Sequence, residues 1–270
     1  MPELPEVEIT RRGIEPFVLG RTITGVAVRN PNLRWRVPRN LARLVVGEQV
    51  QRVARRGKYL LLECASGCLI LHLGMSGSLR VIDPRIPALA HDHVDLLFGE
   101  TALRLRDPRR FGALLWQRGD VHRHRLLAGL GVEPLSEDFS GDYLYSATRK
   151  RQSGIKQLLM NANIVVGVGN IYANESLFRA GIHPRRRAGR LTRAQCERLV
   201  QSVREILRAA LAAGGSSLRD FVHSDGASGY FQQSYCVYDR AGQPCRVCGS
   251  AIRVARLGAR SSFFCAGCQK

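Results

Sequence analysis

Lysine is rare in this sequence, although basic residues are abundant. The 270 residues include 41 basic and 22 acidic residues, which gives a formal net charge of +19. Only four of the basic residues are lysines: Lys58, Lys150, Lys156 and Lys270. Arginine does not release its proton at physiological pH, whereas lysine can. Each internal lysine is therefore a candidate for proton transfer.

Long apolar runs are absent as well. No stretch approaches the ~20 residues that a membrane-spanning helix needs, and the charged start of the chain has no signal-peptide pattern. We therefore expect a cytoplasmic protein that is not inserted in a membrane and whose cysteines are reduced.

The positive charge is spread along the whole chain instead of being gathered in a tail. A folded protein of this charge is expected to bind a polyanion, and nucleic acid is the first candidate. A basic ribosomal protein or a protein of the membrane surface remains an alternative on charge alone.

Four of the eight cysteines follow the spacing C-x2-C-x16-C-x2-C. They are Cys245, Cys248, Cys265 and Cys268. Two such turns facing each other supply the four sulfur ligands of a structural Zn²⁺ ion, with no open position for chemistry. The apolar residues between the two pairs predict a β-hairpin, so we expect a zinc ribbon with one structural zinc. A pair of disulfides or an iron–sulfur site is the alternative.

The first half of the chain predicts one helix followed by short strands. Pro5 suits the first turn of a helix over residues 4–16, and the turn Gly99-Glu100 joins two of the strands. A run of strands with one helix attached indicates a β-sandwich. The predicted strands cover residues 22–29, 50–62, 69–73, 78–82, 94–98, 102–105 and 113–117.

The second half of the chain has helical periodicity. Helices are predicted over residues 155–160 and 171–180, with Gly167 and Gly169 in the turns between them. Glycines ahead of a helix let its free N–H groups approach a phosphate, although a purely structural helix pair is the alternative. Thr192 and Gln195 form a capping-box pattern that begins a further helix, which ends at Gly214-Gly215.

These patterns divide the chain into four parts. We predict a β-sandwich domain over residues 1–130, a linker over 131–137, a helical domain over 138–235 and a zinc ribbon over 236–270.

The start of the chain carries a candidate nucleophile. Removal of Met1 ahead of the small residue Pro2 would leave a secondary amine, and an α-amino group titrates near ~8, well below the ~10.4 of lysine. Such an amine can attack an electrophilic carbon to give an iminium, with the carboxyl group of Glu3 moving protons. Met-Pro-Glu is also an ordinary beginning for a protein, so the rest of the chain has to decide.

Several long motifs run in order along the chain: residues 2–8 (PELPEVE), 55–59 (RRGKY), 72–78 (HLGMSGS), 91–95 (HDHVD), 107–112 (DPRRFG), 167–172 (GVGNIY) and the four cysteines. Together they resemble one family, the formamidopyrimidine-DNA glycosylases, which are bifunctional base-excision enzymes for oxidised purines. The sister family of the endonuclease VIII type acts on oxidised pyrimidines and typically opens Pro-Glu-Gly-Pro-Glu, so Leu4 and Val7 favour the purine-directed branch.

The resemblance implies an α+β fold. An N-terminal β-sandwich with a flanking helix is followed by a helix-two-turns-helix domain with a zinc-ribbon hairpin, and double-stranded DNA with damaged bases or abasic sites binds in the cleft between them. The enzyme would act as a monomer. The damaged base is rotated out of the duplex. The Pro2 nitrogen displaces it, and the resulting iminium promotes loss of the 3′ and then the 5′ phosphate.

The resemblance also implies the catalytic roles. Glu3 acts as acid or base, and Lys58 transfers a proton in the first elimination. Arg260 takes part near the lesion phosphate and in the second elimination, where phosphate binding is favoured over proton donation because arginine hardly deprotonates. The like-charged neighbours Arg55 and Arg56 would lower the pKa of Lys58, which suits proton exchange. Simple phosphate binding is the alternative for Lys58.

DNA contacts follow from the same resemblance. Met75, Arg109 and Phe111 match three side chains that fill the space left by the extruded nucleotide and bond to the orphaned cytosine. His91, Arg151, Lys156 and Asn170 match positions that contact DNA, and Arg151 lies in a run where relatives commonly carry lysine. The segment 216–230, rich in glycine and serine, matches the loop that covers the extruded base. A DNA-binding protein without activity is the alternative from another functional class.

Overall fold

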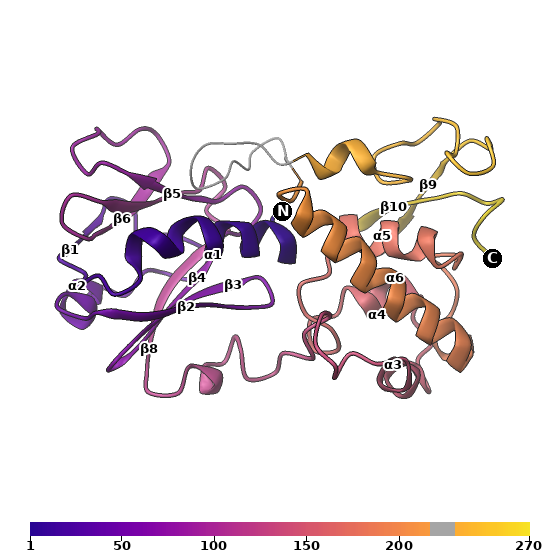
Figure 1. The fold of residues 1–270 in the computed structure, drawn as a ribbon, viewed down its shortest axis with the longest axis horizontal. Coiled ribbons are helices and arrows are strands. Elements are labelled where there is room, and N and C mark those ends of the chain that lie inside the picture. Colours follow the sequence, from indigo (N-terminus) through magenta and orange to yellow (C-terminus); the bar gives the residue numbers. More distant parts are fainter. Residues whose placement is uncertain (217–229) are drawn as a thin grey trace. The chain divides into compact units, whose positions relative to one another are not determined.

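The computed structural model describes residues 1–216 and 230–270 (Figure 1). The chain forms two compact units. The first unit comprises Met1–Ala128 and Ala213–Tyr230, and the second comprises Gly129–Ala212 and Phe231–Lys270. The segment expected to cover an extruded base, 216–230, lies outside the described residues except for its two ends, which pair as a short antiparallel bridge.

The first unit is built on two four-stranded antiparallel sheets. One sheet has the strand order β1-β6-β7-β5 and the other has the order β2-β3-β4-β8. The strands are β1 (Gly25–Val28), β2 (Val50–Arg56), β3 (Tyr59–Cys64), β4 (Gly67–His72), β5 (Ser78–Ile82), β6 (Asp92–Leu97), β7 (Ala102–Arg106) and β8 (Ala113–Arg118).

A single apolar core joins the two sheets. It includes Leu62 and Leu71 from one sheet and Leu96 and Leu105 from the other, all at most 1% exposed. Helix α1 (Leu4–Val18) contributes a stripe of apolar side chains to the same core, and the short helix α2 (Leu41–Val45) covers another part of it. The predicted β-sandwich with a flanking helix is confirmed.

One predicted strand is wrong. The segment 50–62 is not a single strand, because β2 and β3 are joined by a tight turn at Gly57 and Lys58, with Arg56 paired to Tyr59. Gly57 has a φ of 57°, a left-handed conformation that glycine adopts at low cost. The predicted hairpin at Gly99-Glu100 is confirmed by the pairing of β6 with β7.

The second unit contains the predicted helix pair and the long capped helix. Its helices are α3 (Gly141–Thr148), α4 (Ile155–Leu159), α5 (Asn170–Arg179) and α6 (Arg193–Ala212), and its 3-10 turns are η2 (Ala188–Arg190) and η3 (Phe231–Ser234). A further 3-10 turn, η1 (Val121–Arg123), lies in the first unit. The capping box forms, since Thr192 and Gln195 exchange backbone-to-side-chain hydrogen bonds of 3.0 and 3.2 Å. Helix α3 was not predicted.

The ribbon hairpin consists of β9 (Arg253–Leu257) and β10 (Arg260–Phe264) and packs on α5. Two side chains of α5 hold the hairpin and the segment 236–238 that precedes it. The carboxylate of Glu175, which is 2% exposed, accepts hydrogen bonds from the backbone N–H groups of Cys236, Val237 and Tyr238 at 2.8–3.0 Å. Asn174 accepts one from the N–H of Phe263 at 3.0 Å. Among the described residues, no helix is both long and apolar enough to span a membrane.

Candidate functional site

The start of the chain is held firmly against helix α1. Pro2 is buried, and Glu3 is the N-cap of the helix with 2% of its surface exposed. Glu3 and Glu6 form a capping box, in which Glu6 Oε2 accepts from the Glu3 N–H at 2.8 Å. The other oxygen of Glu6 accepts from the N–H of Ser216 at 2.9 Å. Glu6 therefore links the backbone of Glu3, next to the predicted nucleophile Pro2, to the first residue of segment 216–230.

Lys58 lies in the tight turn between β2 and β3, where its side chain is half-buried. Arg55 fastens this turn to helix α1: its Nε donates to Glu8 at 3.1 Å and its Nη1 donates to the carbonyl of Gly57 at 2.9 Å. Burial would raise the pKa of Glu8, but the charges of Arg11 and Arg55 and a hydrogen bond from Arg12 outweigh it, and the pKa is lowered. Glu8 is thus an ionised anchor for the Lys58 turn.

A histidine without a predicted role lies beside this turn. His72 pairs with Tyr59 across β3 and β4, and the two ring centres are 4.9 Å apart. His72 Nδ1 accepts the N–H of Gly74 at 3.0 Å. Burial, followed by the positive charge of Lys58 and of Arg34, lowers the pKa of His72 to about 4. His72 is therefore neutral at physiological pH, with its hydrogen on Nε2.

The three predicted void-filling residues lie on two neighbouring loops of the first unit. Met75 is half-buried on the loop between β4 and β5, and Arg109 and Phe111 are exposed on the loop between β7 and β8. The Arg109 guanidinium stacks 5.0 Å from the centre of the Phe111 ring. His91 is exposed just ahead of β6, with a φ of 74°, and its carbonyl accepts the N–H of Asp107 at 3.0 Å.

In the second unit, two predicted residues converge on one strand. Arg260 is exposed at the first position of β10, after a tight turn whose Gly258 has a φ of 62°. Lys156 is 2% exposed, and its ammonium group donates to Ser261 O and Ser262 Oγ, both at 2.7 Å. Its side chain therefore supports the strand that carries Arg260, and a phosphate contact by Lys156 stays a prediction.

The other two predicted DNA-contacting residues lie elsewhere in the second unit. Asn170 is the first residue of α5, and its carbonyl accepts from the side-chain amide of Asn174 at 2.6 Å. Arg151 is exposed after α3, and its carbonyl accepts the N–H of Gly189 at 3.1 Å. Their DNA contacts stay predictions.

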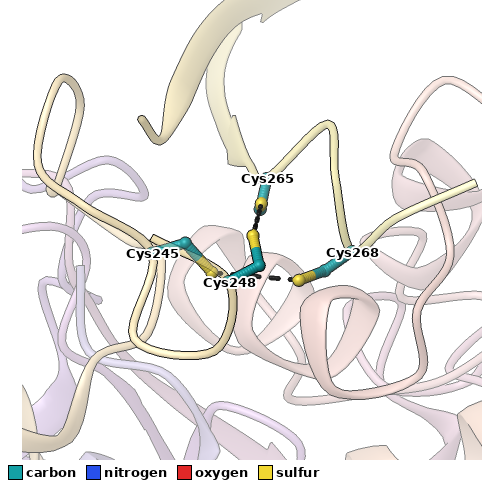
Figure 2. Close-up of side chains that lie close together, drawn as sticks. All are labelled: Cys245, Cys248, Cys265 and Cys268. Carbon is teal, nitrogen blue, oxygen red and sulfur yellow. Dashed lines mark hydrogen bonds between the residues drawn. The ribbon is translucent and has the colours of Figure 1, made fainter. Parts of the chain in front are cut away.

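The four cysteine sulfurs form a zinc site (Figure 2). All four lie within 4.8 Å of one another, and two of the separations are 3.9 Å (Cys245 to Cys268) and 3.4 Å (Cys248 to Cys265). Tetrahedral zinc with Zn–S bonds of ~2.3 Å places its sulfurs ~3.8 Å apart, so the cluster fits this ion.

Residues around the cluster shape the two turns that hold it. A Cβ added at Gly267 would lie 3.2 Å from the sulfur of Cys248, so the close approach of the second turn favours glycine. Gln269 is buried and fastens this turn, accepting from the Cys265 N–H at 2.9 Å and donating to Ile182 O at 2.9 Å.

Three models of known families match the chain. The N-terminal domain of formamidopyrimidine-DNA glycosylase matches residues 1–114, and the H2TH domain of the same enzyme matches residues 130–222. A zinc finger found in FPG and IleRS matches residues 242–270.

Curated relatives match over the whole length. The formamidopyrimidine-DNA glycosylase of Aromatoleum aromaticum is 60% identical over 270 residues, and that of Thioalkalivibrio sulfidiphilus is 57% identical over 271 residues. Both alignments cover 100% of each chain.

Solved structures agree with these matches. The MutM (FPG) protein of Thermus thermophilus is 39% identical with a TM-score of 0.90, and 99% of this chain and 98% of that chain are covered. A complex between Lactococcus lactis Fpg and abasic-site DNA is 34% identical with a TM-score of 0.92, and 99% of each chain is covered. The chain therefore belongs to the formamidopyrimidine-DNA glycosylase family.

Proposed function

We propose that the protein is a bifunctional DNA glycosylase and abasic-site lyase that removes oxidised purines from double-stranded DNA. One observation carries the proposal: a chain 60% identical over its full length to a formamidopyrimidine-DNA glycosylase carries Pro2, Glu3, Lys58, Arg260 and the four zinc cysteines. Relatives of the same fold have been solved with DNA containing an abasic site and with DNA containing N7-benzyl-Fapy-dG. These ligands support a damaged purine and its abasic product as substrates.

The chemistry begins at Pro2 after removal of Met1, because the Pro2 nitrogen is an unreactive amide while Met1 is attached. The free amine attacks the sugar carbon that bears the damaged base. The bond from this carbon to the base breaks, and the base leaves with a proton. The bond from the same carbon to the ring oxygen then breaks, the oxygen takes a proton, and the opened sugar is held as an iminium on Pro2. Glu3 supplies or accepts protons at this step, and its place as N-cap of α1 fixes it beside Pro2.

The two eliminations involve Lys58 and Arg260, each of which lies at a tight turn. The iminium withdraws electrons, so a proton on the adjacent sugar carbon becomes acidic, and Lys58 accepts it as the 3′ phosphate leaves. Loss of the 5′ phosphate follows and leaves a one-nucleoside gap. Arg260 holds a phosphate through its guanidinium group, which suits phosphate geometry and does not give up its proton.

The remaining residues bind the DNA. Met75, Arg109 and Phe111 fill the space of the extruded nucleotide. The DNA backbone is contacted by His91, Arg151, Lys156 and Asn170. Residues Cys245, Cys248, Cys265 and Cys268 hold a structural zinc that keeps the Arg260 hairpin folded. The net charge of +19 supplies affinity for DNA of any sequence. We place the protein in the cytoplasm on chromosomal DNA, where it acts as a monomer.

Borohydride trapping tests the proposal. The protein is prepared in two forms that differ by one residue, one trimmed by methionine aminopeptidase and one that keeps Met1 because the peptidase was inhibited. Intact mass identifies each form. On a duplex with 8-oxoguanine opposite cytosine, we expect the trimmed form to give a covalent adduct and two-step strand cleavage, and the other form to give neither until it is trimmed in vitro.

The alternatives predict other outcomes. A trimmed protein that binds the duplex without forming an adduct would support the inactive DNA-binding protein. An enzyme of the endonuclease VIII type would prefer an oxidised pyrimidine over 8-oxoguanine in a direct comparison. Equal trapping by both forms would overturn the role of the Pro2 nitrogen.

A further inference from the structure

We propose that Asp107 is a positioning residue that locks the two void-filling loops together, so that Met75, Arg109 and Phe111 enter the duplex as one rigid group. Through Arg109, it sets the preference for cytosine opposite the lesion. This inference rests on the proposed function, since it concerns how the same residues engage DNA.

The carboxylate of Asp107 bridges the two loops directly. It is 0% exposed. One oxygen accepts from Ser76 Oγ at 3.2 Å, next to Met75, and the other accepts from the N–H of Gly112 at 2.7 Å, next to Phe111. Each loop therefore has one hydrogen bond to the same buried group, directly beside a residue that is proposed to enter the DNA.

The backbone of Asp107 extends this link to the His91 segment. Its N–H donates to His91 O at 3.0 Å. Its carbonyl accepts from Arg110 N at 3.1 Å and from His93 Nε2 at 2.8 Å. Asp107 thus connects three segments that the proposed function assigns to DNA contact.

Glycines allow the loops to touch at this point. A Cβ added at Gly74, whose φ is 66°, would lie 2.4 Å from the carbonyl carbon of Phe111. A Cβ added at Gly112 would lie 3.0 Å from the Asp107 carboxylate. The backbones of the two loops therefore pack directly on each other. The Asp107 carboxylate accepts hydrogen bonds from the buried donors of both loops.

The buried link bears on how the orphaned base is recognised. The tip of the loop between β7 and β8, where Arg109 stacks on Phe111, is exposed and lies outside both strands. In this proposal the Asp107 link holds the tip in position. A group held in place before binding loses less conformational freedom on binding, so it binds and discriminates better. Loss of the link should therefore reduce the preference for cytosine opposite the lesion more than it reduces the overall affinity for DNA.

The test measures binding of the trimmed full-length protein to duplexes that carry a tetrahydrofuran abasic site opposite cytosine or opposite adenine. The readout is the ratio of the two dissociation constants. Asp107→Ala leaves the Gly112 N–H without an acceptor, and we expect the ratio to fall at least about 5-fold, as for the loss of one specific base contact. Asp107→Asn can accept from Gly112 and donate to Ser76, so we expect it to restore at least half of the preference.

Milder and combined variants separate this role from folding. Ser76→Ala removes one arm of the link and should lower the ratio partway, whereas Ser78→Ala, 3% exposed on β5, is the matched control and should leave it unchanged. In an Arg109→Ala background, Asp107→Ala should have no further effect on the ratio.

An unchanged ratio in folded Asp107→Ala, or an equal loss in Ser78→Ala, would overturn the inference. If Asp107→Ala does not fold, Ser76→Ala decides in the same way. Binding needs no chemistry, so a wild-type protein that discriminates between the duplexes but excises no 8-oxoguanine would refute the proposed function and leave this inference standing.

Discussion

Protonation of His72 should destabilise the first unit as the pH falls. The folded protein lowers the pKa of His72 from its usual value of 6.5 to about 4, through burial and then the charges of Lys58 and Arg34. In the unfolded chain the same ring titrates near ~6.5. Between these two values the unfolded state binds a proton that the folded state does not bind. The stabilising contribution is therefore complete above pH ~6.5 and is lost as the pH falls through about 4.

The structure gives the size of this effect. A difference between 6.5 and about 4 corresponds to about 3 kcal/mol. Because the ring keeps some contact with solvent, we expect about 2–3 kcal/mol of the free energy of unfolding to depend on this one proton.

A conservative variant isolates the contribution. In His72→Asn the side-chain oxygen can still accept the N–H of Gly74, but the group no longer titrates. Between pH 7.5 and pH 4.5, we expect the free energy of unfolding of the wild type to fall by about 2–3 kcal/mol more than that of the variant. His122→Asn, at an exposed position of η1, is the matched control and should follow the wild type.

The assay can report on the first unit alone. Both tryptophans of the chain, Trp35 and Trp116, lie in this unit, so urea unfolding followed by tryptophan fluorescence does not detect the second unit. Parallel curves of unfolding free energy against pH for the wild type and His72→Asn would refute the reasoning. NMR titration of the imidazole gives an independent check, since a pKa near 6.5 in the folded protein would contradict the burial argument.

Three further predictions follow from the site and the second unit. Removal of zinc by a strong chelator should unfold the ribbon and weaken binding to abasic-site DNA by at least about 10-fold, because structural zinc supplies the folding energy of such small units. Binding should recover when zinc is restored. Full binding by protein that metal analysis shows to be free of zinc would contradict this prediction. Glu175→Gln should lower the free energy of unfolding of the second unit by about 2–4 kcal/mol, because an amide cannot accept from all three N–H groups. Thermal unfolding followed by circular dichroism measures the change. A loss below about 0.5 kcal/mol would show that the Glu175 carboxylate does not anchor this segment. Lys58→Gln should slow strand cleavage about 100-fold or more while single-turnover base release falls less, and the exposed Lys270→Gln should change neither rate.

The features predicted well from sequence are those that local spacing determines. The four cysteines lie within 24 residues and specify their own cluster, and the boundaries of β5 follow from apolar alternation between two turn signals. The Thr192 cap is predicted correctly for the same reason, since both partners lie within one helical turn. The split of residues 50–62 into two strands was missed because Gly57-Lys58 is flanked by arginines and tyrosine, which resemble strand residues more than turn residues.

The features that could not be predicted from sequence are buried polar links between distant segments. Asp107 and Glu175 are short acidic side chains whose partners are mainly backbone N–H groups, and every residue type except proline supplies such a group. No spacing rule marks which of these donors will be left without a partner inside the fold. Lys156 shows the same limit: nothing in the sequence marks that its ammonium group donates to Ser261 and Ser262 beside Arg260. Candidate catalytic residues can thus be predicted from motifs, whereas the buried groups that link their loops are seen only in the folded structure.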